Sequence, residues 1–247
     1  MCYDFTARTG APWRTHDRAR LKEKMKTIMN IFLGKNESDR AVIADLRDIK
    51  HLLVAGKTGS GKTEFLRTIV REFINEYKSG EIKFCYFSDC WFLLKDEIPS
   101  EYLLFGVEKS IAKGETEAGV LLSDILQKLN ARAAEKKSDG LCDADKASPE
   151  IILLFDNNAF YCNGENNAKL AEILKNGSDL GIHVVFSLQH VSEKDEEKIK
   201  LFPSVLCGEL CAEKQTKTIL GAGGLKARQQ FGFVLKSPAF NCLVKAS

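Results

Sequence analysis

One short motif constrains this chain more than any other feature. Residues 56–63 (GKTGSGKT) fit the pattern GxxxxGK(S/T) at every fixed position. An apolar run over residues 51–55, typical of a buried strand, precedes the motif, and residues 64–77 carry apolar side chains at helical spacing. A strand, a glycine-rich turn and a helix in this order predict a phosphate-binding P-loop. A turn that merely connected strand to helix would not explain why Lys and Thr follow the last glycine.

Each part of the motif has a role in binding a nucleotide. The glycines let the backbone point N–H groups at phosphate oxygens, and the helix N-terminus adds a favourable dipole. We therefore predict ATP as the ligand, with Lys62 at the β- and γ-phosphates and the Thr63 hydroxyl on Mg²⁺. The predicted nucleotide-binding residues are Gly56, Lys57, Thr58, Gly59, Ser60, Gly61, Lys62 and Thr63.

A second apolar run, residues 151–155 (IILLF), ends in Asp156. A continuous apolar run of this length is typical of a strand buried on both faces of a parallel sheet. A carboxylate at the tip of such a strand holds the Mg²⁺ hydration shell in P-loop ATPases. The alternative is an Asp that caps a turn. Because Lys62 and Thr63 lie upstream, we predict a metal role, with Thr63 and Asp156 as the Mg²⁺ site.

Two amide side chains bear on catalysis. Asn157 stands where ATPases of this architecture usually carry Glu, and an amide orients water but cannot accept its proton. Nucleotide binding is therefore better supported than fast hydrolysis, with Glu165 as a later carboxylate that could substitute. Gln189 follows an apolar run at residues 181–188 and is suited to sense the γ-phosphate. The predicted catalytic residues are Lys62, Asp156 and Gln189.

Composition limits the remaining choices. The chain has 247 residues, is 44% hydrophobic and carries a net charge of +2, which fits one α/β domain and gives no global attraction to nucleic acid. Its eight Cys form no CxxC pair, which favours reduced thiols and a cytosolic compartment. With no run of 18 apolar residues, any membrane association is expected to come from another segment or a partner.

The predicted organisation has three parts. Residues 1–30 form a lead-in with a basic helix, interpreted as a solvated face rather than a phosphate contact; residues 31–240 form the ATPase domain, and residues 241–247 a loosely held tail. Strands alternate with helices, which predicts a mostly parallel sheet flanked by helices. Strands are expected at residues 31–33, 41–46, 82–87, 151–155, 181–188, 204–210 and 231–235, and helices at residues 15–29, 64–77, 117–136, 167–175 and 213–220.

Several segments resemble the FtsK/SpoIIIE family of P-loop motor ATPases, within the HerA/FtsK superfamily. Residues 33–63 are similar to that family's approach to its P-loop, with Lys50 where the family usually has Pro. Residues 178–192 (SDLGIHVVFSLQHVS) resemble the strand that ends in the family's sensor glutamine, here Gln189. Residues 214–224 (KQTKTILGAGG) resemble a region in which Lys217 replaces an Arg that acts in a neighbouring subunit, and Arg228 is a second candidate for that role.

This resemblance implies a RecA-like fold and a ring, usually a hexamer, with ATP bound between neighbours. Many family members pump double-stranded DNA, and related modules drive type VII protein secretion. We expect a cytoplasmic DNA translocase domain, because the P-loop flank resembles DNA pumps most closely. Asn157 and Lys217 instead favour two alternatives. One is a degenerate secretion module that binds ATP and a protein substrate and hydrolyses weakly, and the other is a non-catalytic, nucleotide-dependent assembly module.

Overall fold

The computed structural model describes residues 29–35, 41–90, 94, 96–138, 148–156, 164–189, 196–208, 210, 219–220, 232–236 and 241–245. The strands are β1 (Asn30–Lys35), β2 (Ala41–Asp45), β3 (Leu52–Ala55), β4 (Ile82–Phe87), β5 (Ile111–Ala112), β6 (Glu150–Phe155), β7 (Ile182–Leu188), β8 (Ser204–Cys207), β9 (Gly232–Lys236) and β10 (Asn241–Lys245). The helices are α2 (Leu46–Ile49), α3 (Lys62–Glu76), η1 (Ser100–Tyr102), α5 (Glu115–Ser138), α6 (Gly164–Asn176), η4 (Ser178–Leu180) and α7 (Glu196–Ile199).

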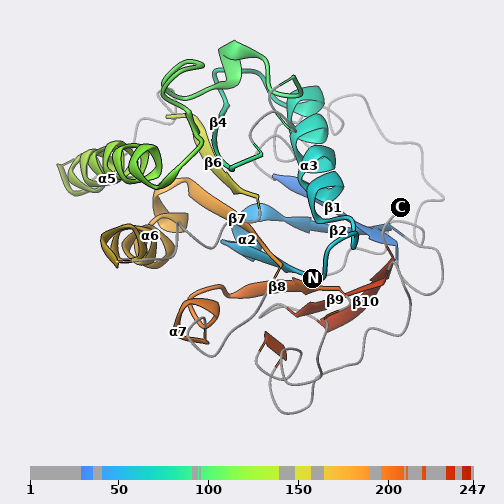
Figure 1. The fold of residues 1–247 in the computed structure, drawn as a ribbon. Coiled ribbons are helices and arrows are strands. Elements are labelled where there is room, and N and C mark those ends of the chain that lie inside the picture. Colours follow the sequence, from blue (N-terminus) through green and yellow to red (C-terminus); the bar gives the residue numbers. More distant parts are fainter. Residues whose placement is uncertain are drawn as a thin grey trace.

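These strands form one ten-stranded sheet in the order β2-β1-β10-β9-β8-β3-β7-β6-β4-β5 (Figure 1). The strands from β8 to β5 pair in parallel, whereas β9, β10, β1 and β2 pair antiparallel. The predicted α/β fold with a mostly parallel sheet is therefore confirmed. Because β7 lies between β3 and β6, the carboxyl ends of these three strands meet at one edge, where ligands bind in open parallel sheets.

Helices cover both faces of the parallel part of the sheet. In Figure 1, α3 lies on one side of the sheet and α5, α6 and α7 lie on the other. One face of α3 buries Leu66, Ile69, Val70 and Phe73 at the spacing of an amphipathic helix. On the opposite face, Phe87, Phe155 and Phe186 stack across three strands with ring centroids 4.1 and 5.0 Å apart. Burial on both faces explains why these strands are continuous apolar runs.

Most predicted elements are found within one to three residues of their expected bounds. The second predicted strand, however, ends at Asp45, whose carboxylate accepts the Arg47 N–H and caps α2. The prediction of a loose tail was wrong for residues 241–245. They form β10, because Leu243 and its neighbours pair with β9 in antiparallel register. The predicted helix over 15–29 lies outside the described residues except Met29, and that over 213–220 except for Ile219 and Leu220.

Candidate functional site

The loop between β3 and α3 has the backbone shape that its glycines predict. Gly59 and Gly61 adopt φ values of +77° and +86°, and no atom lies within 4 Å of the point where a Cβ would be placed on either. Residues with a side chain rarely adopt such φ values. A side chain at either position would project into open space beside the loop. The Gly56 N–H donates to the Leu188 carbonyl at 3.1 Å, which fixes the start of the loop against β7.

The Lys62 side chain folds back over this loop. Its Nζ donates to the Gly56 carbonyl at 2.8 Å and to the Lys57 carbonyl at 3.0 Å. Burial lowers the pKa of the Lys62 ammonium, and the charge of Asp156 opposes this shift only in part. An ammonium short of compensating negative charge, held at the mouth of a glycine-rich loop, suits a phosphate.

Asp156 and Thr63 meet from two different elements. The Thr63 hydroxyl, in the first turn of α3, donates to the carboxylate at the end of β6, with Oγ1 lying 3.3 and 3.2 Å from the two oxygens. The Asp156 side chain is only 3% exposed. Burial raises the pKa of Asp156 above its ordinary value, although the Thr63 hydrogen bond and the Lys62 charge act in the opposite direction. A cation beside this carboxylate would relieve the cost of its burial.

The chemistry of these groups fits a magnesium nucleotide. Mg²⁺ typically takes one or two carboxylates, phosphate oxygens and water, rather than an all-protein cage. Asp156 with the Thr63 hydroxyl supplies that donor set, and no group of three His, Cys, Asp or Glu suited to a metal exists among the described residues. In the loop, the buried Ser60 hydroxyl also has no hydrogen-bond partner. A polar ligand would satisfy it.

Gln189, the residue that follows β7, completes this group. Its side-chain amide donates to the hydroxyl of Thr58 in the loop. The strand order explains the contact, because β7 lies beside β3 and so carries its last residues past the loop. The structure thus brings together Lys62, Thr63, Asp156 and Gln189, which the sequence places far apart.

Comparisons with known proteins show what this chain resembles. A family model described as the FtsK/SpoIIIE family matches residues 16–89. DNA translocase FtsK of Helicobacter pylori (strain J99 / ATCC 700824) is 25% identical over 186 residues, covering 70% of this chain and 22% of that protein. DNA translocase SpoIIIE of Bacillus subtilis (strain 168) is 38% identical over 65 residues, or 26% of this chain and 8% of that protein. Over residues 16–89, which include the P-loop, the chain is thus similar to the FtsK/SpoIIIE family. It spans about a fifth of the length of the FtsK proteins that it matches.

Solved structures share the fold of this chain. EccC of Thermomonospora curvata, comprising ATPases 2 and 3 in complex with a signal sequence peptide, has a TM-score of 0.71 at 20% identity, covering 93% of this chain and 42% of that one. The pCW3 conjugation coupling protein TcpA, with ATPγS, has a TM-score of 0.68 at 21% identity, covering 95% of this chain and 68% of that one. A RecA-like P-loop core is common to all three.

Three residues with predicted roles lie outside the described residues: Asn157, Lys217 and Arg228. Glu165, considered as a substitute base, is described. It pairs with Lys169 at 2.7 Å, and the hydrogen bond and charge of Lys169 lower the pKa of the Glu165 carboxyl. A carboxylate with a lowered pKa is a weaker base, which argues against that role.

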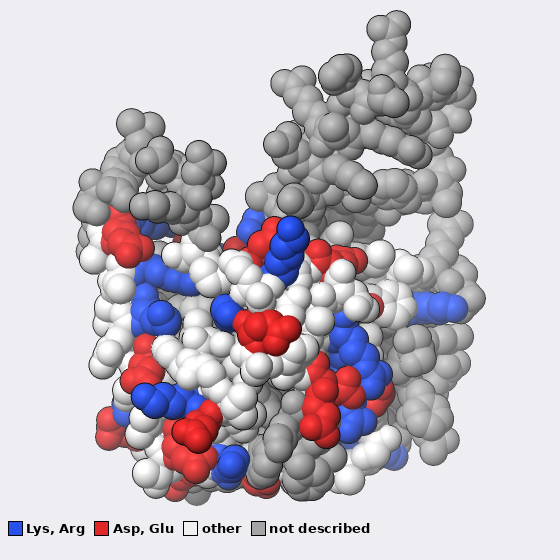
Figure 2. Space-filling view, turned by 90° about the horizontal axis from the view of Figure 1, so that it is seen from above, with Lys and Arg blue, Asp and Glu red and all other residues white. Residues whose placement is uncertain are grey.

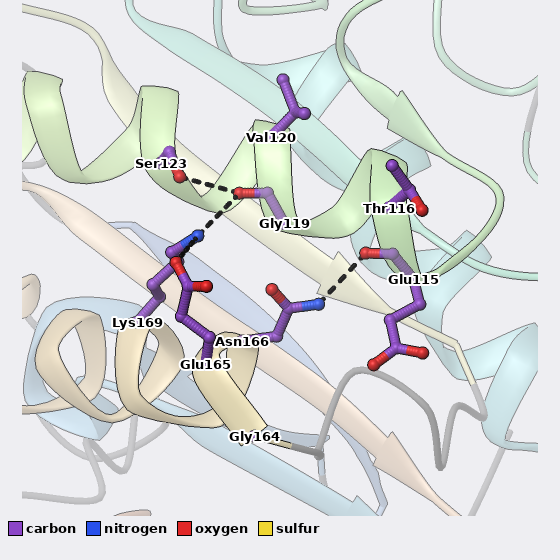
Figure 3. Close-up of a pocket in the computed structure, with 9 residues that line it drawn as sticks. All are labelled: Glu115, Thr116, Gly119, Val120, Ser123, Gly164, Glu165, Asn166 and Lys169. Carbon is purple, nitrogen blue, oxygen red and sulfur yellow. Dashed lines mark hydrogen bonds and ion pairs between the residues drawn. The ribbon is translucent and has the colours of Figure 1, made fainter.

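Glu165 and Lys169 also line a hollow of about 520 Å³ between α5 and α6 (Figure 3). In this hollow the buried Asn166 amide donates to the Glu115 carbonyl at 3.1 Å, and Lys169 reaches the Gly119 carbonyl at 3.4 Å. None of the residues around it belongs to the predicted P-loop site. These polar contacts join the N-terminal halves of the two helices.

Sequence reasoning missed one residue of the site, Tyr86 on β4. Its side chain is fully buried, and its hydroxyl donates to Asp156 Oδ2 at 3.5 Å. Burial raises the pKa of the phenol, so the hydroxyl stays protonated and remains a donor. The available signal was a tyrosine inside an apolar strand, since a buried tyrosine hydroxyl usually finds a polar partner.

Proposed function

We propose that this domain binds ATP with Mg²⁺ and couples its hydrolysis to movement of double-stranded DNA. The observation that carries the proposal is the convergence of Lys62, Thr63, Asp156 and Gln189 at the carboxyl edge of β3, β6 and β7. The names of the FtsK and SpoIIIE relatives support DNA as the polymer.

Each side chain of the site has its own role in this proposal. Lys62 exchanges its two loop carbonyls for the β- and γ-phosphates, and the loop N–H groups bind the remaining phosphate oxygens. Thr63 and Asp156 would hold Mg²⁺, and the metal would supply positive charge beside the phosphates. Gln189 leaves the Thr58 hydroxyl and orients toward the γ-phosphate. The position of the residue that follows β7 therefore depends on whether the γ-phosphate is present. With Asn157 in place of a carboxylate, water is oriented but not deprotonated there.

A ring completes the proposal. We place ATP between neighbouring copies of a ring, taken as a hexamer, with Lys217 or Arg228 of a neighbour reaching the phosphates. On the face shown in Figure 2, positive and negative side chains are interspersed, so DNA contact would depend on a few local cations. Within the described residues, no helix is long and apolar enough to span a bilayer. We propose a cytoplasmic site of action, with membrane association only through another segment or partner.

A type VII-like secretion module is the second candidate. It would bind ATP and a protein substrate and hydrolyse ATP weakly. Asn157 and Lys217 favour it, and EccC has a similar fold. A non-catalytic assembly module is the third candidate.

ATP turnover of the purified chain separates these candidates. It is measured with and without double-stranded DNA across a range of protein concentrations. Turnover that DNA stimulates, and that rises more steeply than concentration, supports the ring motor. Tight ATP binding with negligible turnover in both conditions supports a secretion or assembly module and contradicts the motor.

Lys62→Ala tests the site itself. The loss of charge-assisted hydrogen bonds to phosphate should weaken ATP binding by about 10- to 100-fold. Isothermal titration with ATPγS and Mg²⁺ measures this loss. Lys175→Ala, on the exposed last turn of α6, removes the same charge and should leave the affinity unchanged. Normal affinity in Lys62→Ala would refute the proposed P-loop site.

A further inference from the structure

Tyr86 is an unusual residue for its position in the sheet. It lies in the interior of β4, is 0% exposed, and belongs to the same apolar cluster as Phe84 and Leu154. Phenylalanine occupies two other positions of this strand, Phe84 and Phe87, so packing alone is satisfied there without a hydroxyl. A buried hydroxyl costs about 1–3 kcal/mol when it lacks a partner. The Tyr86 hydroxyl has polar neighbours in the Ser88 side chain and the Asp156 carboxylate, and the carboxylate belongs to the proposed site.

The strand register brings this hydroxyl to the Asp156 carboxylate. Tyr86 pairs with Leu154 and Phe87 with Phe155 in the parallel ladder between β4 and β6. The Asp156 N–H then donates to the Phe87 carbonyl at 2.9 Å, which continues the pairing by one residue. The side chains of Tyr86 and Asp156 therefore share one face of the sheet, and the phenol hydroxyl contacts the carboxylate.

The hydroxyls of Thr63 and Tyr86 approach the carboxylate differently. Thr63 Oγ1 lies 3.3 Å from Oδ1 and 3.2 Å from Oδ2, so it does not distinguish the two oxygens. Tyr86 contacts Oδ2, at 3.5 Å. The Tyr86 contact is made with one oxygen only, so it favours one rotation of the carboxyl group about its Cβ–Cγ bond. Partners of this kind orient the oxygen ligands of metals in proteins.

We propose that Tyr86 is a positioning residue for Mg²⁺, acting through Asp156. Its hydroxyl holds Oδ2 and so presents the carboxylate to the metal and its waters in one orientation. The inference rests on the proposed function of the P-loop site and adds a residue to it. Removing such a partner typically weakens metal binding by about 10- to 100-fold.

The test is Tyr86→Phe, which deletes only the hydroxyl. ATPγS binding is measured by isothermal titration across Mg²⁺ concentrations and in EDTA. We expect the Mg²⁺ concentration that gives the half-maximal increase in ATPγS affinity to rise at least about 10-fold. The ATPγS affinity in EDTA should be unchanged. Tyr102→Phe is the matched control. Its hydroxyl donates to the Tyr77 carbonyl at 2.9 Å, away from the carboxylate, so its loss should leave the Mg²⁺ dependence as it is.

A double-mutant cycle with Asp156→Asn shows whether the effect passes through the carboxylate. In that background, Tyr86→Phe should change the Mg²⁺ dependence no further. An unchanged Mg²⁺ dependence in Tyr86→Phe, or an equal shift in Tyr102→Phe, would overturn the role of Tyr86 and leave the P-loop site standing. If the nucleotide affinity of the wild-type chain did not depend on Mg²⁺, the proposed metal site would be refuted, and the role of Tyr86 with it.

Discussion

At the scale of single residues, two buried histidines lie near the amino ends of the parallel strands, opposite the P-loop. The Val184 N–H donates to His51 Nδ1 at 3.1 Å. His183 contacts the Lys50 carbonyl through Nδ1 at 2.8 Å and Glu150 Oε2 through Nε2 at 3.3 Å. Burial lowers the pKa of His51 from 6.5 to about 3, and the charges of His183 and Lys50 lower it further within that shift. His51 is therefore neutral in the folded protein at neutral pH.

This neutral imidazole makes stability depend on pH. Between pH 6.5 and about 3 the unfolded chain binds a proton at His51 that the folded chain does not, so stability falls as the pH falls through this range. The slope from one such group is at most about 1.4 kcal/mol per pH unit. Urea unfolding at several pH values measures it, and His51→Asn should flatten it. An imidazole NMR titration that places every histidine near its ordinary pKa would contradict the prediction.

Lys50 shows a residue-scale feature that sequence patterns do not reveal. Its φ of 63° and ψ of −73° place it at the centre of a γ-turn, closed by the His51 N–H on the Ile49 carbonyl at 2.8 Å. Proline, usual at this place in the family, fixes φ near −65° and could not form this turn. The residues around Lys50 in the sequence do not mark a positive φ, and the Lys50 carbonyl contacts His183, which is 133 residues away.

At the scale of elements, the junction between α6 and β7 depends on the absence of a side chain. Gly177 has an ordinary helical φ of −67°. A Cβ there, however, would lie 2.6 Å from the Ile173 carbonyl oxygen and 2.9 Å from that of Ile182. Both are backbone atoms, so a larger residue must push the helix end away from the strand.

Gly177→Ala should therefore destabilise the domain by about 1–3 kcal/mol, measured by chemical denaturation. Gly80→Ala is the matched control, since no atom lies within 4 Å of its Cβ position and its φ is not in the left-handed region. It should change stability by less than about 1 kcal/mol. If the two substitutions changed the free energy of unfolding equally, the backbone around Gly177 would have to accommodate a Cβ without loss of stability, which would contradict the prediction.

The elements differ in how far the sequence predicted them. Strands β4, β6 and β7 were found because burial on both faces leaves long apolar runs. Strand β10 was missed because polar Asn241 and Lys245 flank only three apolar residues. The strand order rests on parallel pairs between residues as far apart as Leu52 and Ser204, and the Tyr86 contact joins residues 70 positions apart. No local pattern encodes such pairs. The P-loop itself was predictable because its chemistry requires a fixed spacing.

At the scale of the whole molecule, the sheet has two parts with different relations to the proposed site. The described side chains of the site come from the parallel part: from the loop after β3, from α3 and β4, and from the residues that follow β6 and β7. The antiparallel strands β9, β10, β1 and β2 extend the sheet on the far side of β8. A ligand at the P-loop would therefore stabilise the parallel part by direct contact. It would stabilise the antiparallel part only because the two parts unfold cooperatively.

A magnesium nucleotide should consequently stabilise the domain and slow exchange unevenly. At 100 times the dissociation constant, binding contributes about 2.7 kcal/mol, which raises the Tm of a domain of this size by about 5–10 °C. Hydrogen exchange at short times should slow most in loop residues 56–61 and at the carboxyl ends of β6 and β7, and least in β9 and β10. Lys62→Ala, at the same nucleotide concentration, should lose both effects. A Tm increase that persists in Lys62→Ala, or protection centred on β9 and β10, would locate the nucleotide elsewhere in the molecule.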